Sequence, residues 1–258
     1  MKQLSIIIVS WNVKDLLRQC LQSIAENKGN IDLEVWVVDN DSQDQTVEMI
    51  KQEFPWINLI ANNKNLGFAK ANNLAINKAN GQYLLLLNPD TKIFPDTLEK
   101  SLAFIESHPE CGALGCKMLY PNGTIQPSIR RFPNWLVIFL ILIKIPKIFP
   151  NLKIFKRYLA EDFDYNKTQT AEQIMGAFML IPRSVFNKVG ILDEKFFNWF
   201  EEVDFCRRIW QAKYKIYYFA EAQIIHYGGQ SFSQEKLLKN QWIFFSSAIK
   251  YFLKNLIK

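Results

Sequence analysis

Apolar residues in the first ninety positions form two kinds of pattern that alternate along the chain. Short continuous runs predict buried strands, and runs that recur every three or four residues predict amphipathic helices. The strands are expected at 4–9, 33–38, 57–60 and 83–87, and the helices at 13–24, 44–54 and 68–79. Because buried strands that alternate with helices build sheets covered on both faces, the pattern predicts an α/β fold with a mostly parallel central sheet flanked by helices.

The second half of the chain is patterned less regularly. Strands are expected near 113–118, 178–181, 215–219 and 224–226, and a helix near 202–212. Aromatic and aliphatic residues interleave with lysines over 234–258, which predicts a basic amphipathic helix at the C-terminal end. We therefore expect one continuous domain over residues 1–233, with an acceptor- or membrane-facing insertion near 130–165, and this helix beyond it.

Polar residues follow three of the predicted strands at the points where they stop. These polar groups are Ser-Trp-Asn at 10–12, Asp-Asn-Asp-Ser at 39–42 and Asn-Pro-Asp at 88–90. At any single strand end such residues are typical of a simple turn. Ligands of open α/β sheets bind beyond the carboxyl ends of the strands, so three converging polar ends favour a polar ligand site.

Composition and motifs exclude several other classes of protein. The net charge of +6 is too small to indicate a nucleic-acid partner. The 4 cysteines form no CxxC pair, and they are interpreted as buried thiols of a reducing cytosol. The glycine-rich dinucleotide motif and the P-loop motif are absent, which argues against a dinucleotide-binding or P-loop protein. GxSxG and HExxH are also absent, which argues against the common hydrolases and metalloproteases. The first residues resemble a strand and not a signal peptide.

A basic and apolar segment over 130–158 contains no acidic residue. Its longest apolar run, 135–143, is too short to span a bilayer, which needs roughly 20 residues. Two interpretations remain open. The segment could lie in the headgroup layer of an anionic membrane, or it could be a core helix followed by a solvated basic loop.

Several motifs occur in an order and spacing typical of one enzyme family. They are Ile-Val-Ser-Trp-Asn (8–12), Val-Val-Asp-Asn-Asp-Ser (37–42), Asn-Leu-Gly-Phe-Ala-Lys-Ala-Asn-Asn (65–73), Leu-Leu-Asn-Pro-Asp (86–90), Met-Gly-Ala-Phe-Met-Leu-Ile-Pro-Arg (175–183), Phe-Phe-Asn-Trp-Phe-Glu-Glu-Val-Asp-Phe-Cys-Arg-Arg (196–208) and Ile-His-Tyr-Gly-Gly-Gln-Ser (225–231). Together they resemble family 2 glycosyltransferases, closest to the rhamnosyltransferase-like branch, over about residues 4–231. The resemblance implies the GT-A fold, a Rossmann-like sheet that binds nucleotide-diphospho-sugars.

The resemblance also implies which residues bind the nucleotide-sugar and a metal ion. Asp39 would accept hydrogen bonds from the base, and Asp90, in the place of the family's DxD motif, would bind Mn²⁺ or Mg²⁺. His226 would be a second protein ligand of the metal or a contact to the diphosphate. Asn88 stands where that motif has its first aspartate. The nucleotide-sugar pocket would be lined by Ser10, Trp11, Asn12, Asp39, Asn40, Asn65, Gly67, Asn72, Asn88 and Asp90.

An acidic pair at a helix start provides the catalytic base in the family. Here the pair is Glu201-Glu202, and Glu202 is expected to be the base, with Glu201 and Asp204 as alternatives. Acids at a helix N-terminus are also favoured by the helix dipole without any catalytic role. Arg207 and Arg208 could pair with these acids or with phosphate. On the acceptor side the resemblance implies Arg130, Arg131, Gly176 and Ala177.

These features favour a metal-dependent inverting glycosyltransferase at the cytoplasmic face of the cell membrane, acting in cell-surface glycan synthesis. The implied donor is dTDP-L-rhamnose, with UDP-sugars second, and the implied acceptor is a polyprenyl-diphosphate-linked glycan or a polysaccharide. Peripheral membrane contact is expected, and nucleic acid is not. Two other classes stay open: a nucleotidyltransferase, and a non-catalytic protein that binds nucleotide-sugars or serves as a membrane scaffold.

Overall fold

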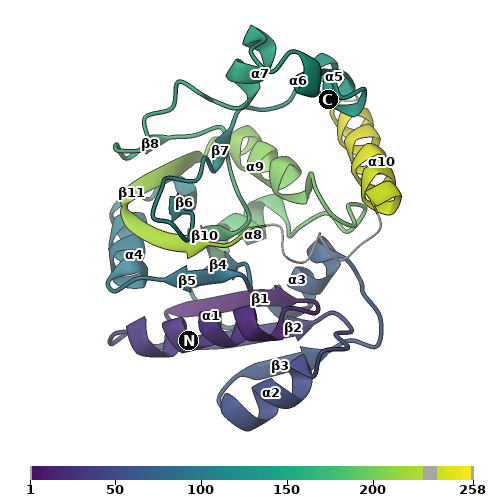
Figure 1. Ribbon diagram of the computed structural model, residues 1–258. Helices are drawn as coiled ribbons and strands as arrows, with labels where there is room; N and C mark the ends of the chain where they lie inside the picture. The colour runs from purple at the N-terminus through teal and green to yellow at the C-terminus, as the bar shows by residue number, and fades with distance from the viewer. Residues whose placement is uncertain (1, 229–236, 257–258) are drawn as a thin grey trace.

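A mixed β-sheet with helices on both faces forms the centre of the molecule, as a computed structural model of residues 2–228 and 237–256 shows (Figure 1). The described residues form a nine-stranded sheet in the order β3-β2-β1-β4-β10-β6-β11-β5, with β8 paired to β11. A two-stranded sheet of β7 and β9 lies beside it. The strands are β1 (Leu4–Ser10), β2 (Leu33–Asp39), β3 (Asn58–Ala61), β4 (Tyr83–Leu87), β5 (Thr91–Ile93), β6 (Cys111–Leu119), β7 (Ile129–Arg130), β8 (Gln169–Thr170), β9 (Gln173–Ile174), β10 (Phe178–Pro182) and β11 (Lys215–His226).

The helices cover the two faces of the sheet through two separate apolar clusters. Alternate residues of each strand supply the two clusters, so that Ile6 and Ile8 face one side and Ile7 faces the other. The first cluster packs under α1 (Lys14–Asn27), α2 (Thr46–Glu53) and α4 (Thr97–Ser107). The second packs under α3 (Phe68–Ile76), α8 (Arg183–Val189) and α9 (Glu201–Gln211).

The parallel pairing predicted from the sequence is concentrated in the first half. Strands β3, β2, β1 and β4 are all parallel, and the register pairs Ser10 with Asp39. Strand β10 then enters antiparallel between β4 and β6, although β6 and β11 are parallel again. The α/β class and the flanked sheet agree with the prediction, and the second half of the sheet is mixed because β10 runs against its neighbours.

Strand β11 is longer than the sequence indicated. The two strands expected near 215–219 and 224–226 are one strand, Lys215–His226, with a register shift between Phe219 and Gln223. A bulge of this kind lets a strand continue past unpaired residues. The continuous strand brings His226 beside Thr91 of β5, close to the end of β4.

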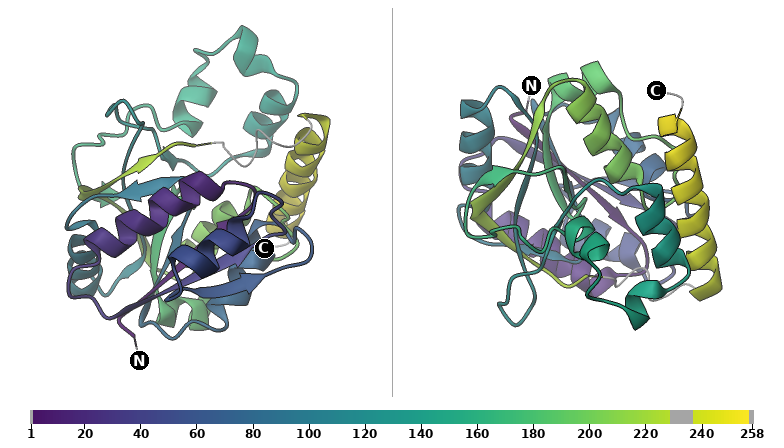
Figure 2. Two further views of the ribbon diagram at one scale, coloured as in Figure 1. Left: turned by 60° about the horizontal axis from the view of Figure 1, so that its bottom comes forward. Right: turned by 90° about the horizontal axis from the view of Figure 1, so that it is seen from above.

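Four helices form what we call the helical cap. They are α5 (Trp135–Leu142), α6 (Ile145–Ile148), α7 (Lys153–Tyr158) and α10 (Leu237–Leu256). Both views of Figure 2 place α10 alongside α5, although nearly a hundred residues separate them. A third apolar cluster joins them to the loop before α9, and it contains Val137, Phe155, Phe196, Phe200 and Tyr251. None of the described helices combines the length and apolar content needed to cross a membrane.

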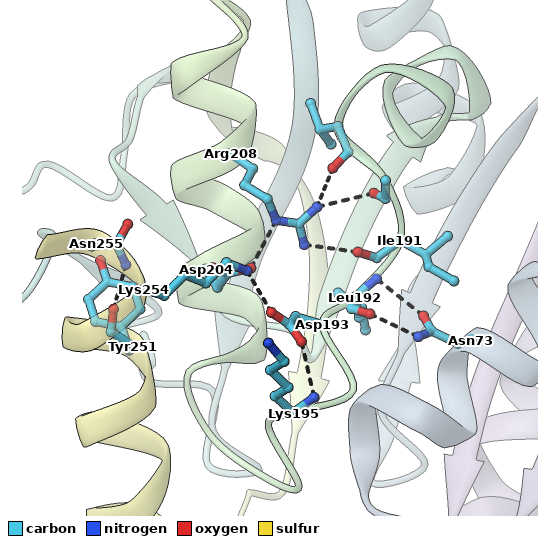
Figure 3. A network of polar contacts seen from close by, with 12 residues as sticks. Asn73, Ile191, Leu192, Asp193, Lys195, Asp204, Arg208, Tyr251, Lys254 and Asn255 are labelled. Atoms are coloured by element: carbon cyan, nitrogen blue, oxygen red, sulfur yellow. Dashed lines mark hydrogen bonds and ion pairs between the residues drawn. The ribbon is translucent and has the colours of Figure 1, made fainter. Parts of the chain in front are cut away.

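Ion pairs fasten α10 to the body of the protein (Figure 3). The Lys254 ammonium lies 2.8 Å from Asp204 of α9 and 2.6 Å from Asp193. Arg208 binds the same Asp204 at 2.9 Å and donates hydrogen bonds to the carbonyl oxygens of Val189 and Ile191. The network therefore ties α9, α10 and the loop after α8 together.

Candidate active site

A cavity of about 540 Å³ opens at the carboxyl ends of β1, β2 and β4. This volume is within the range of small-molecule sites. Its walls come from both halves of the chain. The lining residues are Val9, Trp11, Asn40, Asn65, Gly67, Phe68, Asn88, Pro89, Asp90, Tyr120, Gln126, Met175, Gly176, Ala177, Asn198, Trp199, Glu201, Glu202, His226, Tyr227 and Gly228.

Asp90 and His226 meet at one end of the cavity. The His226 Nε2 lies 3.4 Å from the Asp90 carboxylate, and both side chains are buried. The other ring nitrogen, Nδ1, donates a hydrogen bond of 2.8 Å to the Gln126 side-chain oxygen. Because that oxygen only accepts, Nδ1 carries the proton of this hydrogen bond, and Nε2 is the ring nitrogen that faces Asp90. Asn88 places its side-chain nitrogen 3.4 Å from the same Nε2.

This arrangement fits a divalent cation that is held mainly by its substrate. A carboxylate oxygen and an imidazole nitrogen lie 3.4 Å apart, and a cation bound by both would take each of them as a ligand. No group of three or more His, Cys, Asp or Glu side chains suited to a metal occurs in the described part of the chain. Asp90 and His226 would therefore supply two ligands, leaving the rest to phosphate oxygens and water, which is typical of Mg²⁺ at phosphate sites.

Buried polar atoms without partners lie at the adjoining ends of β1 and β2. The Asp39 carboxylate accepts a hydrogen bond from the Ser42 backbone N–H at 3.0 Å through one oxygen. Its second oxygen and the Ser10 hydroxyl are buried, and each lacks a hydrogen-bond partner among the described residues. Burial raises the pKa of Asp39 above its usual value, against the hydrogen bonds from Ser42. Such unpaired groups are costly unless a ligand satisfies them.

The loop before α3 is shaped by Asn40. Its side-chain amide binds the Asn65 side chain and the Gly67 carbonyl oxygen, each at 3.3 Å. Gly67 has a φ of +81°, which favours glycine, and an added Cβ would lie 2.4 Å from the Phe197 carbonyl oxygen. The resemblance placed Gly67 among the residues of the nucleotide-sugar pocket. The structure adds a close approach of the Phe197 backbone, whose carbonyl also accepts from the Phe68 N–H at 2.8 Å.

Glu201 and Glu202 enter the cavity at the start of α9. One carboxylate oxygen of each is buried without a hydrogen-bond partner among the described residues. Burial raises the pKa of both carboxyls, and the charge of Glu202 raises the pKa of Glu201 further. Both carboxyls are therefore harder to ionise than a glutamate in water, because each is buried and each is close to the other.

A strained turn precedes the acidic pair. Trp199 and Phe200 both have positive φ values, 62° and 69°, which residues with a side chain adopt at an energetic cost. Phe200 is buried in the cluster of the helical cap, where its ring lies 5.4 Å from those of Phe244 and Tyr251. The Ser247 hydroxyl of α10 donates a hydrogen bond to the Asn198 carbonyl oxygen at 2.9 Å. Helix α10 therefore holds the turn that presents Glu201 and Glu202.

The structure brings most, but not all, of the predicted site residues to the cavity. Those that line it are Trp11, Asn40, Asn65, Gly67, Asn88, Asp90, Gly176, Ala177, Glu201, Glu202 and His226. Those that are not among the lining residues are Ser10, Asn12, Asp39, Asn72, Arg130, Arg131 and Asp204. Ser10 and Asp39 are nevertheless neighbours in the sheet register, next to the cavity residues Trp11 and Asn40.

The residues outside the cavity have other contacts. The Asn12 side-chain oxygen accepts from the Gln43 N–H at 2.6 Å, and Asn72 donates to the Phe68 carbonyl oxygen at 2.9 Å. Arg131 pairs with Asp162 at 2.7 Å. These contacts position loops and helix ends.

Arg130 and Asp204 are likewise occupied away from the cavity. The Arg130 guanidinium donates to the backbone oxygens of Pro127 and Ile129. Asp204 is held by Arg208 and Lys254, which bears out the expected pairing of Arg208 with an acid at this helix. The structure therefore does not bring Asp204 to the cavity together with Glu201 and Glu202.

Other lining residues were not identified from the sequence. Tyr120 and Gln126 flank the turn after β6, and Trp199 and Asn198 precede the acidic pair. Asn198 and Trp199 fall within a motif already quoted, so their proximity to the pair was an available signal. Gln126 contacts His226 across 100 positions of sequence, and no spacing pattern marks such a contact.

Comparison with known proteins places the chain in a family. The family described as "Glycosyl transferase family 2" matches residues 5–190. An N-acetylglucosaminyl-diphospho-decaprenol L-rhamnosyltransferase of Mycobacterium tuberculosis is 26% identical over 208 residues, covering 76% of this chain and 67% of that protein. The rhamnosyltransferase WbbL of Escherichia coli is 26% identical over 263 residues, covering 97% of this chain and 89% of that protein.

Solved structures with the same fold include GalNAc-T7 with UDP, GalNAc and Mn²⁺, at a TM-score of 0.66 and 17% identity. Staphylococcus aureus TarS 1-349 is similar at a TM-score of 0.59 and 20% identity. The alignments cover 88% and 89% of this chain, but only 43% and 62% of the two solved chains. At this level of identity they establish the GT-A fold.

Proposed function

Because the chain belongs to glycosyltransferase family 2 and is a sugar-transferring enzyme of glycan synthesis, we propose that it transfers L-rhamnose from dTDP-L-rhamnose with inversion. The acceptor in this proposal is a polyprenyl-diphosphate-linked glycan or a growing polysaccharide. Two curated relatives are rhamnosyltransferases, and one name includes a diphospho-decaprenol acceptor. A UDP-sugar is the second candidate donor, since TarS, a structural neighbour, has been solved with UDP-GlcNAc.

The observation that carries the proposal is the distribution of chemistry around one cavity. The Asp90–His226 pair suits a diphosphate with its cation, and the acidic pair Glu201-Glu202 suits a hydroxyl that must lose a proton. Beside them, the unpartnered oxygens of Asp39 and Ser10 are acceptors for the N–H of a pyrimidine base. A nucleotide diphosphate linked to a sugar would occupy all of these groups at once.

Metal dependence is part of the proposal. Asp90 and His226 would hold Mn²⁺ or Mg²⁺, with Gln126 fixing the ring of His226 through its Nδ1–H. The ion, when bound, would neutralise charge on the departing diphosphate. Asn88 contributes an amide and no charge, so the protein supplies one carboxylate here, from Asp90, to the metal end of the site.

Glu202 is the proposed base. Its carboxylate would take the proton of the acceptor hydroxyl while that oxygen attacks the anomeric carbon, and the bond from that carbon to the nucleotide diphosphate breaks in the same displacement. Burial raises the pKa of Glu202 above its usual value, which makes its carboxylate a stronger base than one in water. Glu201 lies beside it, and burial together with the charge of Glu202 raises the pKa of Glu201, which disfavours a second negative charge in the site.

The acceptor places the reaction at the cytoplasmic face of the cell membrane in this proposal. A polyprenyl diphosphate is fixed in the bilayer by its chain, so the enzyme must approach the membrane surface. Gly176 and Ala177 line the cavity and leave room for a bulky acceptor. The two arginines first expected on that side, Arg130 and Arg131, hold the backbone and Asp162 in this structure.

The test is a panel of dTDP, UDP, GDP and CMP, each with and without Mn²⁺, read as the shift in melting temperature. We expect the largest metal-dependent shift with dTDP, and a larger shift with UDP would select the alternative donor. Glu202→Gln should keep the shift and lose transfer by at least about a hundredfold, since removal of a general base costs 10²–10⁴-fold. Glu221→Gln, an exposed glutamate on β11, is the matched control. Full transfer by Glu202→Gln would refute the assignment of the base.

A further inference from the structure

The outer surface of the helical cap exposes large apolar side chains. Trp135, Ile148 and Trp242 are 67%, 67% and 68% exposed, although residues of these types are usually buried or paired. Further exposed apolar residues of the cap are Leu136, Phe139, Ile143, Phe149, Leu152, Leu159, Phe245, Ile249 and Leu253. Clustered exposure of this kind marks a surface that binds something apolar.

Two segments distant in sequence build this surface together. On α10, Trp242, Phe245, Ile249 and Leu253 recur at helical spacing, so they form one exposed stripe. The opposite side of α10, with Ala248 and Tyr251, packs in the same cluster as Val137 and Ile138 of α5. Figures 1 and 2 show α10 beside α5, with α6 and α7 continuing from α5. The exposed apolar residues therefore belong to one packed unit.

The positive charge of this surface indicates the kind of partner that binds it. Lys144, Lys147, Lys153 and Arg157 are exposed on α6, α7 and the residues between them. None of these four forms an ion pair with another described residue. Helix α10 adds apolar groups here, and its lysines Lys250 and Lys254 bind the Lys195 carbonyl oxygen and the acids of Figure 3.

Tryptophans and lysines on helices that themselves contain no acidic residue, as in α5, α6, α7 and α10, are suited to a bilayer interface, although Glu161 just after α7 pairs with Lys156. Apolar bodies enter the boundary between headgroups and acyl chains, and the basic heads stay among anionic headgroups. A protein partner of complementary chemistry would need a large acidic and apolar surface. A second copy of this chain would bring the same positive charge, which repels.

We propose that the outer surface of the helical cap docks on an anionic lipid bilayer. This inference rests on the proposed function for its purpose, which is delivery of a lipid-linked acceptor to the cavity. The cap is linked to the acidic pair, because Phe200 packs between Phe244 and Tyr251 immediately before Glu201. Docking would therefore place the acceptor end of the cavity near the membrane without requiring a spanning helix.

The experiment measures co-sedimentation of the full chain with vesicles of phosphatidylcholine alone and of phosphatidylcholine with 30% phosphatidylglycerol, at two salt concentrations. Two variants test the surface: Trp135→Ser with Phe149→Ser, and Lys144→Ala with Lys147→Ala. Their matched controls on α2 and the turn after it are Trp56→Ser, a tryptophan 46% exposed, and Lys51→Ala, an exposed lysine. All replaced side chains are solvent-exposed, so folding is retained and is checked by the melting temperature.

We expect binding to anionic vesicles that falls with salt, weakens about fivefold per lysine removed, and weakens at least about tenfold in the double apolar variant. The controls should bind as the unmodified chain does. Equal vesicle binding by cap variants and controls would overturn the proposal. So would a dimer in solution that dissociates in the apolar variant without any vesicle binding.

The nucleotide panel separates this inference from the proposed function. Nucleotide binding in solution without vesicle binding would refute docking alone. Vesicle binding that depends on the cap, with no response to any nucleotide, would support docking and refute the proposed donor site.

Discussion

Replacing Asp204 by Asn should destabilise the protein strongly while leaving the chemistry of the folded enzyme in place. The Asp204 side chain is 2% exposed and receives the Arg208 guanidinium at 2.9 Å and the Lys254 ammonium at 2.8 Å. Asparagine preserves the shape but removes the charge that both cations face. Breaking a buried ion pair by neutralising one partner costs about 3–5 kcal/mol.

The size of the destabilisation depends on the contacts that Arg208 and Lys254 retain in the variant. Arg208 retains its hydrogen bonds to backbone oxygens, and Lys254 retains Asp193. These remaining contacts place the expected loss near the lower end, at about 3 kcal/mol. For a chain of this length each kcal/mol lowers the melting temperature by about 2–4 °C, so we expect a fall on the order of 10 °C.

Urea unfolding and thermal unfolding measure this loss, with Asp162→Asn as the control. Asp162 pairs with Arg131 at the surface, where its side chain is 67% exposed, and such pairs contribute about 1 kcal/mol or less. Transfer by Asp204→Asn is measured well below its melting temperature and normalised to folded protein. A change in stability no larger than that of the control, together with abolished transfer, would refute our reasoning and make Asp204 a catalytic candidate again.

Two further predictions concern the ends of the cavity. Gln126→Leu removes the acceptor of the His226 Nδ1–H, so the affinity for Mn²⁺ in the presence of nucleotide should fall at least about tenfold. Titration with Mn²⁺ measures this affinity, and an unchanged value would contradict the positioning role of Gln126. Burial and the charge of Glu202 raise the pKa of Glu201 in the folded protein, so ionisation of Glu201 opposes folding. The contribution of Glu201 to the free energy of unfolding is therefore greatest below its unfolded pKa of about 4.3, and it is lost as the pH rises through the folded pKa. Glu201→Gln should therefore flatten the decline of unfolding free energy as the pH rises above that unfolded value, and an unchanged slope would argue against the raised pKa.

Much of the fold was predictable because local pattern and burial coincide in the first half. The run at 83–87 is strand β4, and the periodic apolar residues at 68–79 correspond to α3. Helix α4 was missed, although Leu98, Leu102 and Ile105 have helical spacing and all face the core. The union of 215–219 and 224–226 into β11 could not be predicted, since a bulge depends on the pairing with β6.

The candidate site was predictable where its residues lie at strand ends and helix starts. Asp90, Glu201 and Glu202 occupy such positions and line the cavity. The contacts of Asp204 and Gln126 could not be predicted from their positions in the sequence. Asp204 lies three residues from Glu201 in sequence, yet its charge is directed to α10, and only the packing of Lys254 reveals this.

The contact between Gly67 and Phe197 also bears on how such enzymes can be recombined. Residues 4–90 form one uninterrupted segment that contributes Trp11, Asn40 and Asp90 to the cavity, whereas the acidic pair comes from a later segment. The two segments meet at Gly67 and Phe197, and at Asn73, whose amide binds the Leu192 backbone. A chimaera that exchanges the first segment for that of a relative could change the donor nucleotide while keeping the acceptor. Such an exchange should keep glycine at position 67, where a Cβ would lie 2.4 Å from the Phe197 carbonyl oxygen, and asparagine at position 73, whose amide pairs with both backbone groups of Leu192.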